Sequence, residues 1–301
     1  PRACTTTFRQ RQNDPMSTTS SEGPDIEELL HRAEEAARAV EAAPEEEEDR
    51  RDDALWDCIS ELRAAGGDRA LEGARAWAAS GSVALRGLAA DVLGQLHPSA
   101  ESATFRGRCI ETVVPLLDDE EPGVVGNAIT ALGHLRSRAD DEWDGAELLP
   151  FATHPDEGVR FAFCVALGGS PVERSPEVLD AFLALMEDED DDIRDWTTFG
   201  AGVQCETLVD PRLTEALVRR LDDPHEETRV EAIHALALRG AARSAPPIDA
   251  YLASGEAPSP VFEAIAAAPD RRYVDALQRF ADATDAEVIR EAREACAALP
   301  E

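Results

Sequence analysis

The stretch DEGVRFAFCVALG, residues 156–168, decides the fold. We count positions from Val159, the apolar residue at which the predicted helix begins. Positions 0, 4, 7 and 8 fall on one side of a helix, so the helix carries a single apolar stripe. Arg160 follows the opening residue, and Ala166, Leu167 and Gly168 complete the pattern. The stretch therefore predicts an amphipathic helix that packs against its neighbours through small residues.

The same pattern recurs along most of the chain. In each copy a shorter apolar helix and an acidic turn precede the patterned helix, as Leu213–Leu221 precedes Asp222-Asp223-Pro224. Acidic residues there are expected to cap the following helix and to suit its dipole. Because a lone helix pair cannot cover its own apolar face, such repeats stack into an α-solenoid. The patterned helices open at Leu85, Val124, Val159, Ile193, Thr228, Pro260 and Val288, 28 to 39 residues apart.

Glycine returns at one position of this pattern, 9 residues after the opening residue. A glycine inside a helix costs about 1 kcal/mol relative to alanine, so its return needs a reason in the packing. We expect close contact with the next repeat at these glycines. They are Gly94, Gly133, Gly168 and Gly202.

The repeats predict an all-α fold, an α-α superhelix (solenoid) of about seven helix pairs wound right-handedly. Residues 1–23 carry no periodic apolar pattern and are expected to form a disordered tail. Residues 24–65 hold two amphipathic helices, 24–43 and 49–65, which we expect to cap the N-terminal end. Residues 66–301 are the predicted repeat array.

The charge balance excludes some partners. The chain has 62 acidic residues against 29 basic ones, all of them arginine, for a net charge of −33. Such a surface repels phosphate backbones and anionic membranes, whereas a basic protein or peptide would be steered towards it. The acidity also has a general explanation, since excess charge keeps a protein dispersed. We expect no nucleic-acid and no membrane partner.

The 6 cysteines are scattered and include no Cys-x-x-Cys pair. Most lie on apolar positions of predicted helices, as reduced core thiols do. The sequence has no apolar run of membrane-spanning length and no secretory signal in its first residues. These features predict a cytoplasmic protein, which we expect to be a monomer.

Two motifs resemble a known family. Asp156-x-x-Val159-Arg160 precedes Ala166-Leu167-Gly168, and Leu221-Asp222-Asp223-Pro224 precedes Arg229 and Ala235-Leu236. Both are similar to HEAT repeats, including those of the bacterial phycobilisome lyase-like branch, and the resemblance covers roughly residues 68–299. It implies a ladder between neighbouring repeats, formed by acidic turns and the arginines that follow them, and broken where Val125 replaces arginine. The matching positions are Asp156, Asp190 and Asp285, with Arg86, Arg160, Arg194 and Arg229.

Enzymatic signatures of HEAT-fold proteins do not match this sequence. Deoxyhypusine hydroxylase uses repeated His-Glu pairs for two irons, and the chain has one such pair, His225-Glu226, in a turn. HEAT-like DNA glycosylases need a cationic groove, and no motif points to the bilin of a phycobilin lyase. The run Glu187–Asp192 lacks the glycine and glutamate of a calcium loop and is interpreted as a solvated acidic turn. We therefore assign no catalytic, cofactor or metal-binding residue.

One stretch departs from the pattern, because Trp196 and Phe199 stand away from the apolar stripe of their helix. In such solenoids the second helices line the concave surface, and exposed aromatic clusters are typical of interfaces. The alternative is that both rings flank the stripe and pack between adjacent repeats. The candidate binding face comprises Asn127, Thr130, His134, Phe161, Val165, Asp195, Trp196, Phe199, Val203, Glu231 and His234.

These observations predict a non-enzymatic scaffold that binds a protein or peptide on its concave face, and the negative charge favours a basic partner. Two alternatives stay open. One is a lyase-like or other enzyme that acts on a small molecule in the same groove. The other is an acidic antagonist of a basic protein, such as the immunity partner of a toxin.

Overall fold

The computed structural model describes residues 25–41, 48–96, 103–137, 143–280 and 286–299. The predicted tail, residues 1–23, lies outside this range. Within it the chain is helical and contains no strand, so the predicted all-α solenoid of helix pairs is confirmed. The chain divides into two compact units, residues 1–141 (unit 1) and 142–301 (unit 2), which are described separately.

Unit 1 is organised around one helix. Helix α5 packs against α2 and α3 on one side and against α7 on the other, with α4 and α6 completing the helix pairs. Helices α2 and α3 are the two predicted by the N-terminal apolar patterns. The helices are α2 (Ile26–Glu41), α3 (Glu48–Ala65), α4 (Gly67–Ala78), α5 (Val83–Gln95), α6 (Ala103–Val113), the 3-10 helix η2 (Val114–Asp118) and α7 (Pro122–Ser137).

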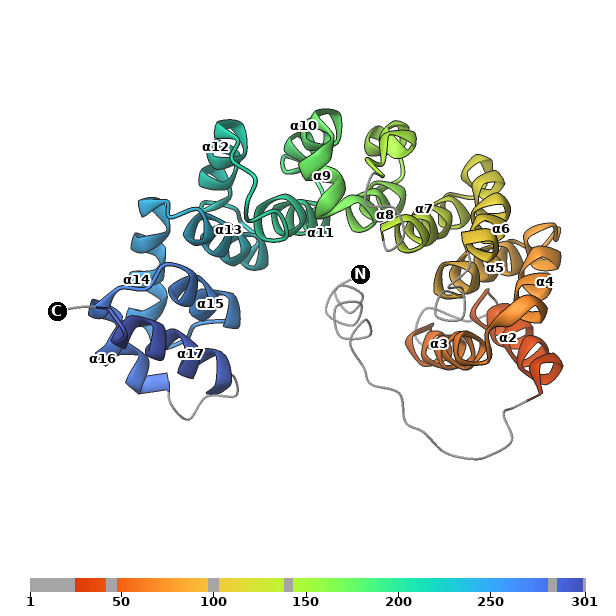
Figure 1. The fold of residues 1–301 in the computed structure, drawn as a ribbon, viewed down its shortest axis with the longest axis horizontal. Helices are drawn as coiled ribbons and strands as arrows, with labels where there is room; N and C mark the ends of the chain where they lie inside the picture. The colour runs from red at the N-terminus through yellow and green to blue at the C-terminus, as the bar shows by residue number, and fades with distance from the viewer. Residues whose placement is uncertain (1–24, 42–47, 97–102, 138–142, 281–285, 300–301) are drawn as a thin grey trace. The chain divides into compact units, whose positions relative to one another are not determined.

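Unit 2 has two layers of helices (Figure 1). The first-helix layer contains η3 (Ala146–Thr153), α10 (Pro176–Leu185), α12 (Pro211–Arg220), α14 (Ala245–Ser254) and α16 (Val274–Leu277). The second-helix layer contains α8 (Glu157–Leu167), α11 (Asp191–Thr197) with the π-helix η4 (Thr198–Val203), α13 (Glu226–Leu238), α15 (Ser259–Ala267) and α17 (Ala286–Ala297). Short helices connect them: α9 (Ser170–Arg174), η5 (Ala242–Ser244), η6 (Arg271–Tyr273) and η7 (Gln278–Phe280).

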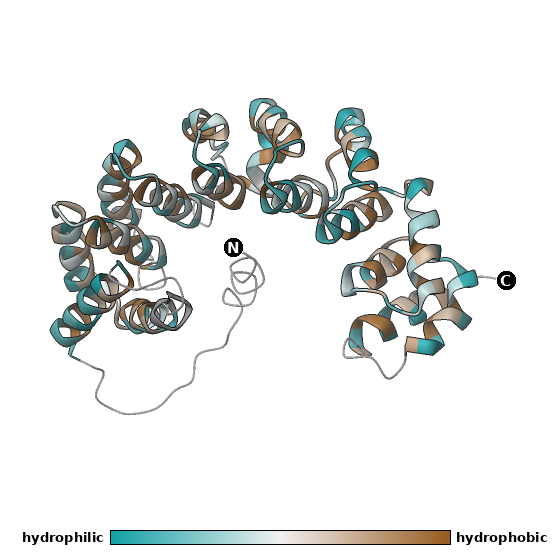
Figure 2. Ribbon diagram, turned by 180° about the vertical axis from the view of Figure 1, so that it is seen from behind, coloured by the Kyte–Doolittle hydropathy of each residue, from teal (hydrophilic) through white to brown (hydrophobic). Residues whose placement is uncertain are grey.

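The core lies where the two layers meet. Each second helix turns its apolar stripe towards the first helices, as Val159, Phe163 and Leu167 of α8 show by being completely buried. Figure 2 shows the same pattern as hydrophobic residues gathered on the facing sides of neighbouring helices. Because each helix contacts the helices of its own pair and of the adjacent pairs, the core continues from pair to pair within each unit.

Three of the repeated glycines lie where second helices come into close contact. A Cβ on Gly94 of α5 would lie 2.9 Å from the Cα of Ala131 in α7, and one on Gly202 would lie 2.8 Å from the Cβ of Ala235 in α13. At Gly168 the Cβ would meet the Gln204 side chain at 2.8 Å. The predicted packing role is confirmed at these three positions. For Gly133 it stays a prediction.

No helix within the described ranges is both long and apolar enough to cross a bilayer. Five cysteines lie in those ranges, and all are buried, as the sequence predicted for core thiols. Burial raises the pKa of Cys109 to about 11 and that of Cys205 to about 12, so neither is a thiolate at neutral pH. Cys4 lies outside the described residues.

Candidate functional site

An arginine near the start of a second helix ties neighbouring repeats together. The Nε and Nη2 atoms of Arg160 donate to the two carboxylate oxygens of Asp188, at 2.8 and 2.9 Å. Its Nη1 donates to the backbone carbonyls of His154 and Pro155, at 3.0 and 3.2 Å. One guanidinium therefore forms hydrogen bonds both with the turn before its own helix, α8, and with the turn before the next second helix, α11. Both side chains are nearly buried, which strengthens this two-pronged ion pair.

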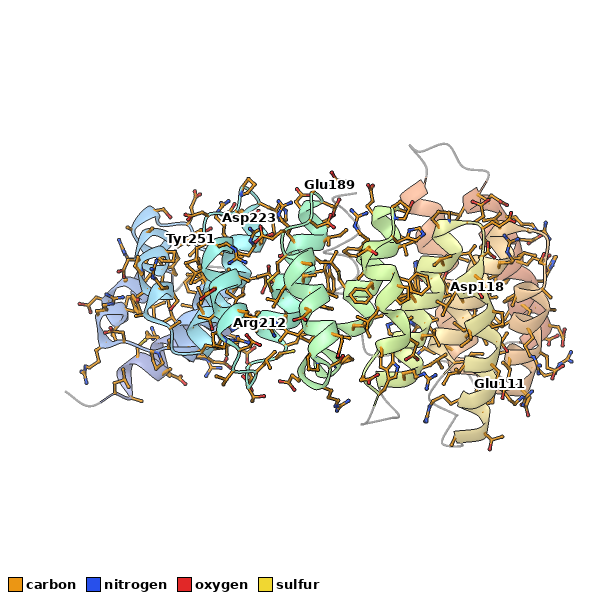
Figure 3. The ribbon with its side chains drawn as sticks, turned by 90° about the horizontal axis from the view of Figure 1, so that it is seen from above. Glu111, Asp118, Glu189, Arg212, Asp223 and Tyr251 are labelled. Carbon is orange, nitrogen blue, oxygen red and sulfur yellow. The ribbon has the colours of Figure 1, made fainter. Side chains whose placement is uncertain are left out.

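The arrangement repeats at two further pairs. Arg194 donates to Asp223 at 3.0 and 3.1 Å, and Arg86 donates to Asp119 at 2.6 and 2.9 Å. Burial alone would raise the pKa of Asp223, but hydrogen bonds from Arg194 and from the His225 backbone N–H outweigh it and lower that pKa. Figure 3 shows Asp223 on the same edge of unit 2 as Glu189 and Tyr251. We call these three pairs the arginine ladder.

The acidic members of the ladder differ from those that the family resemblance implied. Asp156 and Asp190 are N-caps instead, accepting hydrogen bonds from the backbone N–H of Val159 and Ile193, at 3.2 and 3.0 Å. The assignment of these two aspartates to the ladder was wrong. Asp190 also lies in the acidic turn, where the carboxylates of Asp190, Asp191 and Asp192 approach within 4.8 Å at the start of α11. The helix dipole stabilises carboxylates there. Asp285 lies outside the described residues.

Val125 occupies the ladder position of α7, and a valine side chain forms no ion pair. The acidic position of the next turn is also changed, to His154, whose Nδ1 accepts the backbone N–H of Asp156 at 3.1 Å. Asp188 uses a carboxylate oxygen for the equivalent bond, from the N–H of Asp190 at 3.0 Å. The boundary between the two units falls between Val125 and His154 in the chain.

The second-helix face of unit 2 carries an aromatic row. The ring of Trp196 contacts Phe161 of α8 with a centroid distance of 5.7 Å and Phe199 with 6.0 Å, both nearly perpendicular. Such edge-to-face pairs add about 0.5–1.5 kcal/mol each to the burial of the rings. Trp196 is only 7% exposed, whereas Phe161 and Phe199 are half-buried. For Trp196 the structure therefore supports the alternative, a ring that packs between adjacent repeats.

The π-helix η4 begins two residues after Trp196 and changes the direction of the side chains that follow. The hydroxyls of Thr197 and Thr198 each donate at 2.7 Å to a backbone carbonyl four residues earlier, those of Ile193 and Arg194. A threonine hydroxyl that bonds a carbonyl in this way competes with the backbone N–H groups that normally bond it. The residues that follow adopt the wider π-helical form. The backbone N–H of Gln204 then reaches back five residues to the carbonyl of Phe199, at 3.0 Å.

Arg239, which follows α13, stabilises the end of this π-helix. Its guanidinium donates to the backbone carbonyls of Cys205, at 2.7 Å, of Ala201, at 3.3 Å, and of Gly202. Carbonyls at a helix end lack intrahelical partners, so a cation from the next repeat satisfies them. Burial lowers the pKa of Arg239, which nevertheless stays charged at neutral pH.

Two acidic residues of the predicted face are more buried than the sequence pattern suggested. Asp195 is 5% exposed and Glu231 is 4% exposed. Asp195 lies one helical turn before Phe199. Glu231 lies three residues after Thr228, the same position in α13 that Trp196 has in α11. Carboxylates and aromatic rings are thus placed together on adjacent second helices.

His234 is the next polar residue on this face. Its Nδ1 lies 3.3 Å from Oε2 of Glu263 in α15, and burial lowers the pKa of His234 to about 4. The ring is therefore neutral at pH 7. Glu263 was not among the predicted face residues, although it has the same place in α15 as Glu231 has in α13.

We expect acid to weaken the fold through His234. Its folded pKa lies below the ordinary value of 6.5, so the unfolded state binds more protons and stability falls as the pH drops from 6.5 towards 4. The loss attributable to His234 should be roughly 1–2 kcal/mol, less than the full shift implies because Glu263 favours the protonated ring. His234→Asn keeps the donor without the titration. Urea denaturation of both proteins across this pH range should show diverging stabilities, and parallel curves would exclude this role.

Unit 1 holds the remaining predicted face residues. The Nδ2 of Asn127 donates to Asp91 of α5 at 3.1 Å, and the Nδ1 of His134 lies 3.2 Å from Nε2 of Gln95, also in α5. Thr130 lies half-buried between them in the sequence. These polar pairs join the second helices α5 and α7. Applying the repeat register to α5 would have found Asp91 and Gln95, which occupy the positions of Thr130 and His134.

Comparisons with known proteins identify the fold. No protein-family model matches the chain, and no curated protein matches it. The structure of Escherichia coli YibA aligns with a TM-score of 0.64 at 17% sequence identity, covering 94% of this chain and 100% of YibA. An engineered protein has a TM-score of 0.40 at 18% identity, covering 87% of this chain and 67% of its own. Human deoxyhypusine hydroxylase in complex with glycerol has a TM-score of 0.32 at 20% identity, covering 90% of this chain and 96% of its own.

The chain has the fold of an all-α helical-repeat solenoid, which it shares with YibA. The likeness to YibA supports this fold and carries no statement about activity, because the sequences are so different.

Proposed function

We propose that this chain is a non-enzymatic scaffold that binds a protein or peptide on the second-helix face of unit 2. The observation that supports this most is the aromatic row of Phe161, Trp196 and Phe199, which spans two neighbouring second helices. Its outer rings are half-buried, and so are the adjacent Val165 and Val203. Rigid aromatic side chains of this kind are common anchors of protein interfaces.

The construction of the face also suits binding. Its side chains come from α8, α11 and α13, and the arginine ladder links the turns that precede these helices. A surface built on helices that are linked in this way is organised before a partner arrives, so binding costs less conformational entropy. A face to which several successive helices contribute suits a polypeptide, whose contacts are spread along its length.

Site-specific photo-crosslinking tests this proposal. Benzoylphenylalanine is placed at Phe161 or at Phe199, and the matched control is Phe151, a half-buried phenylalanine in η3 of the first-helix layer. Trp196 is avoided because it is buried. We expect irradiation of cells that produce these variants to give a discrete adduct with the same protein from Phe161 and Phe199, and none from Phe151.

Circular dichroism and melting curves first establish that all three variants remain folded. Adducts that form equally from Phe151, or no adduct from either residue of the aromatic row, would contradict a binding role for this face.

A further inference from the structure

The second helices that carry the aromatic row, and the next second helix along the chain, begin with acidic residues. Glu157 is the first residue of α8, Asp191 is the first of α11, and Glu227 is the second of α13. We call these three residues the acidic strip. The second helices α5, α7 and α15 have no acidic residue in their first turn, and α17 has Glu287. The strip and the aromatic row therefore occur on the same part of unit 2.

The acidic strip lies on the same side of these helices as the candidate binding face. Residues four apart are neighbours on a helix surface, with about 5–6 Å between their Cβ atoms. A partner that covers the aromatic row therefore lies one helical turn from the strip. Each acidic residue precedes a face residue by this interval: Glu157 precedes Phe161, Asp191 precedes Asp195, and Glu227 precedes Glu231.

The acidic strip is open to solvent. The side chains of Asp191 and Glu227 are 54% and 67% exposed, and Glu157 is exposed as well. Nε2 of His225 lies 4.0 Å from Asp191 and 3.0 Å from Glu227, so the strip residues of α11 and α13 lie close together. Acidic residues in a first turn also stabilise their own helix, so the strip indicates a partner only in combination with the aromatic row beside it.

An amphipathic helix fits the strip and the aromatic row together. Its apolar side chains recur on one face and cover the half-buried rings of Phe161 and Phe199, while basic side chains on one flank reach the strip. The radius of a helix with its side chains is about 5–6 Å, which matches the distance of one turn between row and strip. In an extended strand, neighbouring side chains point to opposite faces, so its basic residues would point away from the protein.

The span of the face sets the length of the bound helix. Neighbouring helices pack about 8–10 Å apart, so α8, α11 and α13 cover roughly 16–20 Å. A helix that rises about 1.5 Å per residue needs about 11–14 residues to cross them. The net charge of −33 attracts a basic segment from a distance, and the strip then orients it.

We propose that the aromatic row and the acidic strip together bind an amphipathic α-helix of the partner protein. The helix crosses α8, α11 and α13, with its apolar face on the aromatic row and with lysine or arginine side chains on the flank beside the strip. This inference rests on the proposed scaffold function and specifies the chemistry of the partner.

Fluorescence anisotropy with synthetic peptides tests the inference on the full chain. The probe is a fluorescein-labelled peptide of about 14 residues, with leucine on one helical face, lysine on one flank and alanine elsewhere. One matched peptide has the same residues in an order without an apolar face, and another has glutamate in place of lysine. We expect the probe to bind at least about fivefold more tightly than the reordered peptide, which has the same charge. A smaller ratio would overturn the inference, since bulk charge would then explain the binding.

A triple variant locates the binding on the strip. It carries Glu157→Gln, Asp191→Asn and Glu227→Gln, all at exposed positions. We expect it to weaken binding of the probe by at least about fivefold, and the control variant by less than about twofold. Equal losses in the two variants would overturn the assignment to the strip. The control removes the same charge from exposed positions of α10, α12 and α16 in the first-helix layer, with Glu177→Gln, Glu215→Gln and Asp275→Asn.

Reversing the charge of the strip distinguishes contact from attraction at a distance. With Glu157→Lys, Asp191→Lys and Glu227→Lys the chain stays strongly acidic, so bulk charge still favours the lysine peptide over the glutamate peptide. Direct contact predicts that this preference falls at least about fivefold, and a smaller fall would overturn the inference.

Circular dichroism establishes that the reversed variant is folded, and the neutral triple variant decides the question if it is not. If the crosslinks at Phe161 and Phe199 form but the probe binds no better than the reordered peptide, the scaffold function stands and only this inference fails.

Discussion

Replacing Asp223 by alanine is expected to destabilise unit 2 by about 3–5 kcal/mol, because the change leaves buried positive charge without its partner. The Asp223 side chain is 1% exposed and accepts from Arg194, from Arg220 at 2.9 Å and from the His225 backbone N–H at 2.9 Å. Urea denaturation followed by the fluorescence of Trp143 and Trp196, both buried in unit 2, measures the loss.

The matched control is Asp222→Ala, one residue earlier in the same turn, where the side chain is exposed. It should change the unfolding free energy by about 0.5 kcal/mol or less. If the two variants lose similar stability, the ladder pair contributes no more than an ordinary surface charge.

Enlarging Gly94 should have the second large effect. A leucine there would place its Cβ 2.9 Å from the backbone of α7 at Ala131, and a helix backbone cannot move aside as a flexible side chain can. We expect Gly94→Leu to destabilise unit 1 by about 3 kcal/mol, despite the better helix propensity of leucine.

Gly107→Leu is the control for this change, since Gly107 lies inside α6 and a Cβ there meets nothing within 4 Å. It should raise the unfolding free energy by up to about 1 kcal/mol. Denaturation monitored by circular dichroism separates the two outcomes, and a neutral Gly94→Leu would show that α5 and α7 are not in tight contact.

Much of the fold could be predicted because the repeat pattern reports the packing directly. The apolar stripes identified the second helices, and the glycines identified where those helices touch, as Gly94 and Gly202 show. The ladder arginines Arg86, Arg160 and Arg194 were also found, since each follows the residue that opens its helix.

The acidic partners of the ladder were harder to predict. Asp188 and Asp190 lie in one turn, two residues apart, and either could face the preceding helix. Only the turn geometry decides, because the N–H of Ile193 takes Asp190 as its cap and leaves Asp188 to Arg160. Sequence spacing carries no information about this division.

The directions of the side chains after Thr197 could not be predicted from helical periodicity. Beyond Thr197 the chain leaves the 3.6-residue repeat, because the π-helix has more residues per turn and rotates the following side chains. The adjacent threonines and the run Gly200-Ala201-Gly202 are weak signals of that irregularity. A prediction that assumes a regular helix therefore places the side chains of residues 198–203 on the wrong part of the helix surface.

Hydrogen exchange of the Asp223→Ala variant tests most directly whether the ladder holds the second helices together as one surface. The account predicts faster amide exchange in both α11 and α13, which flank the lost pair, while α5 and α7 of unit 1 keep their protection. Exchange that increases only in the turn around residue 223, with α11 and α13 unchanged, would contradict it.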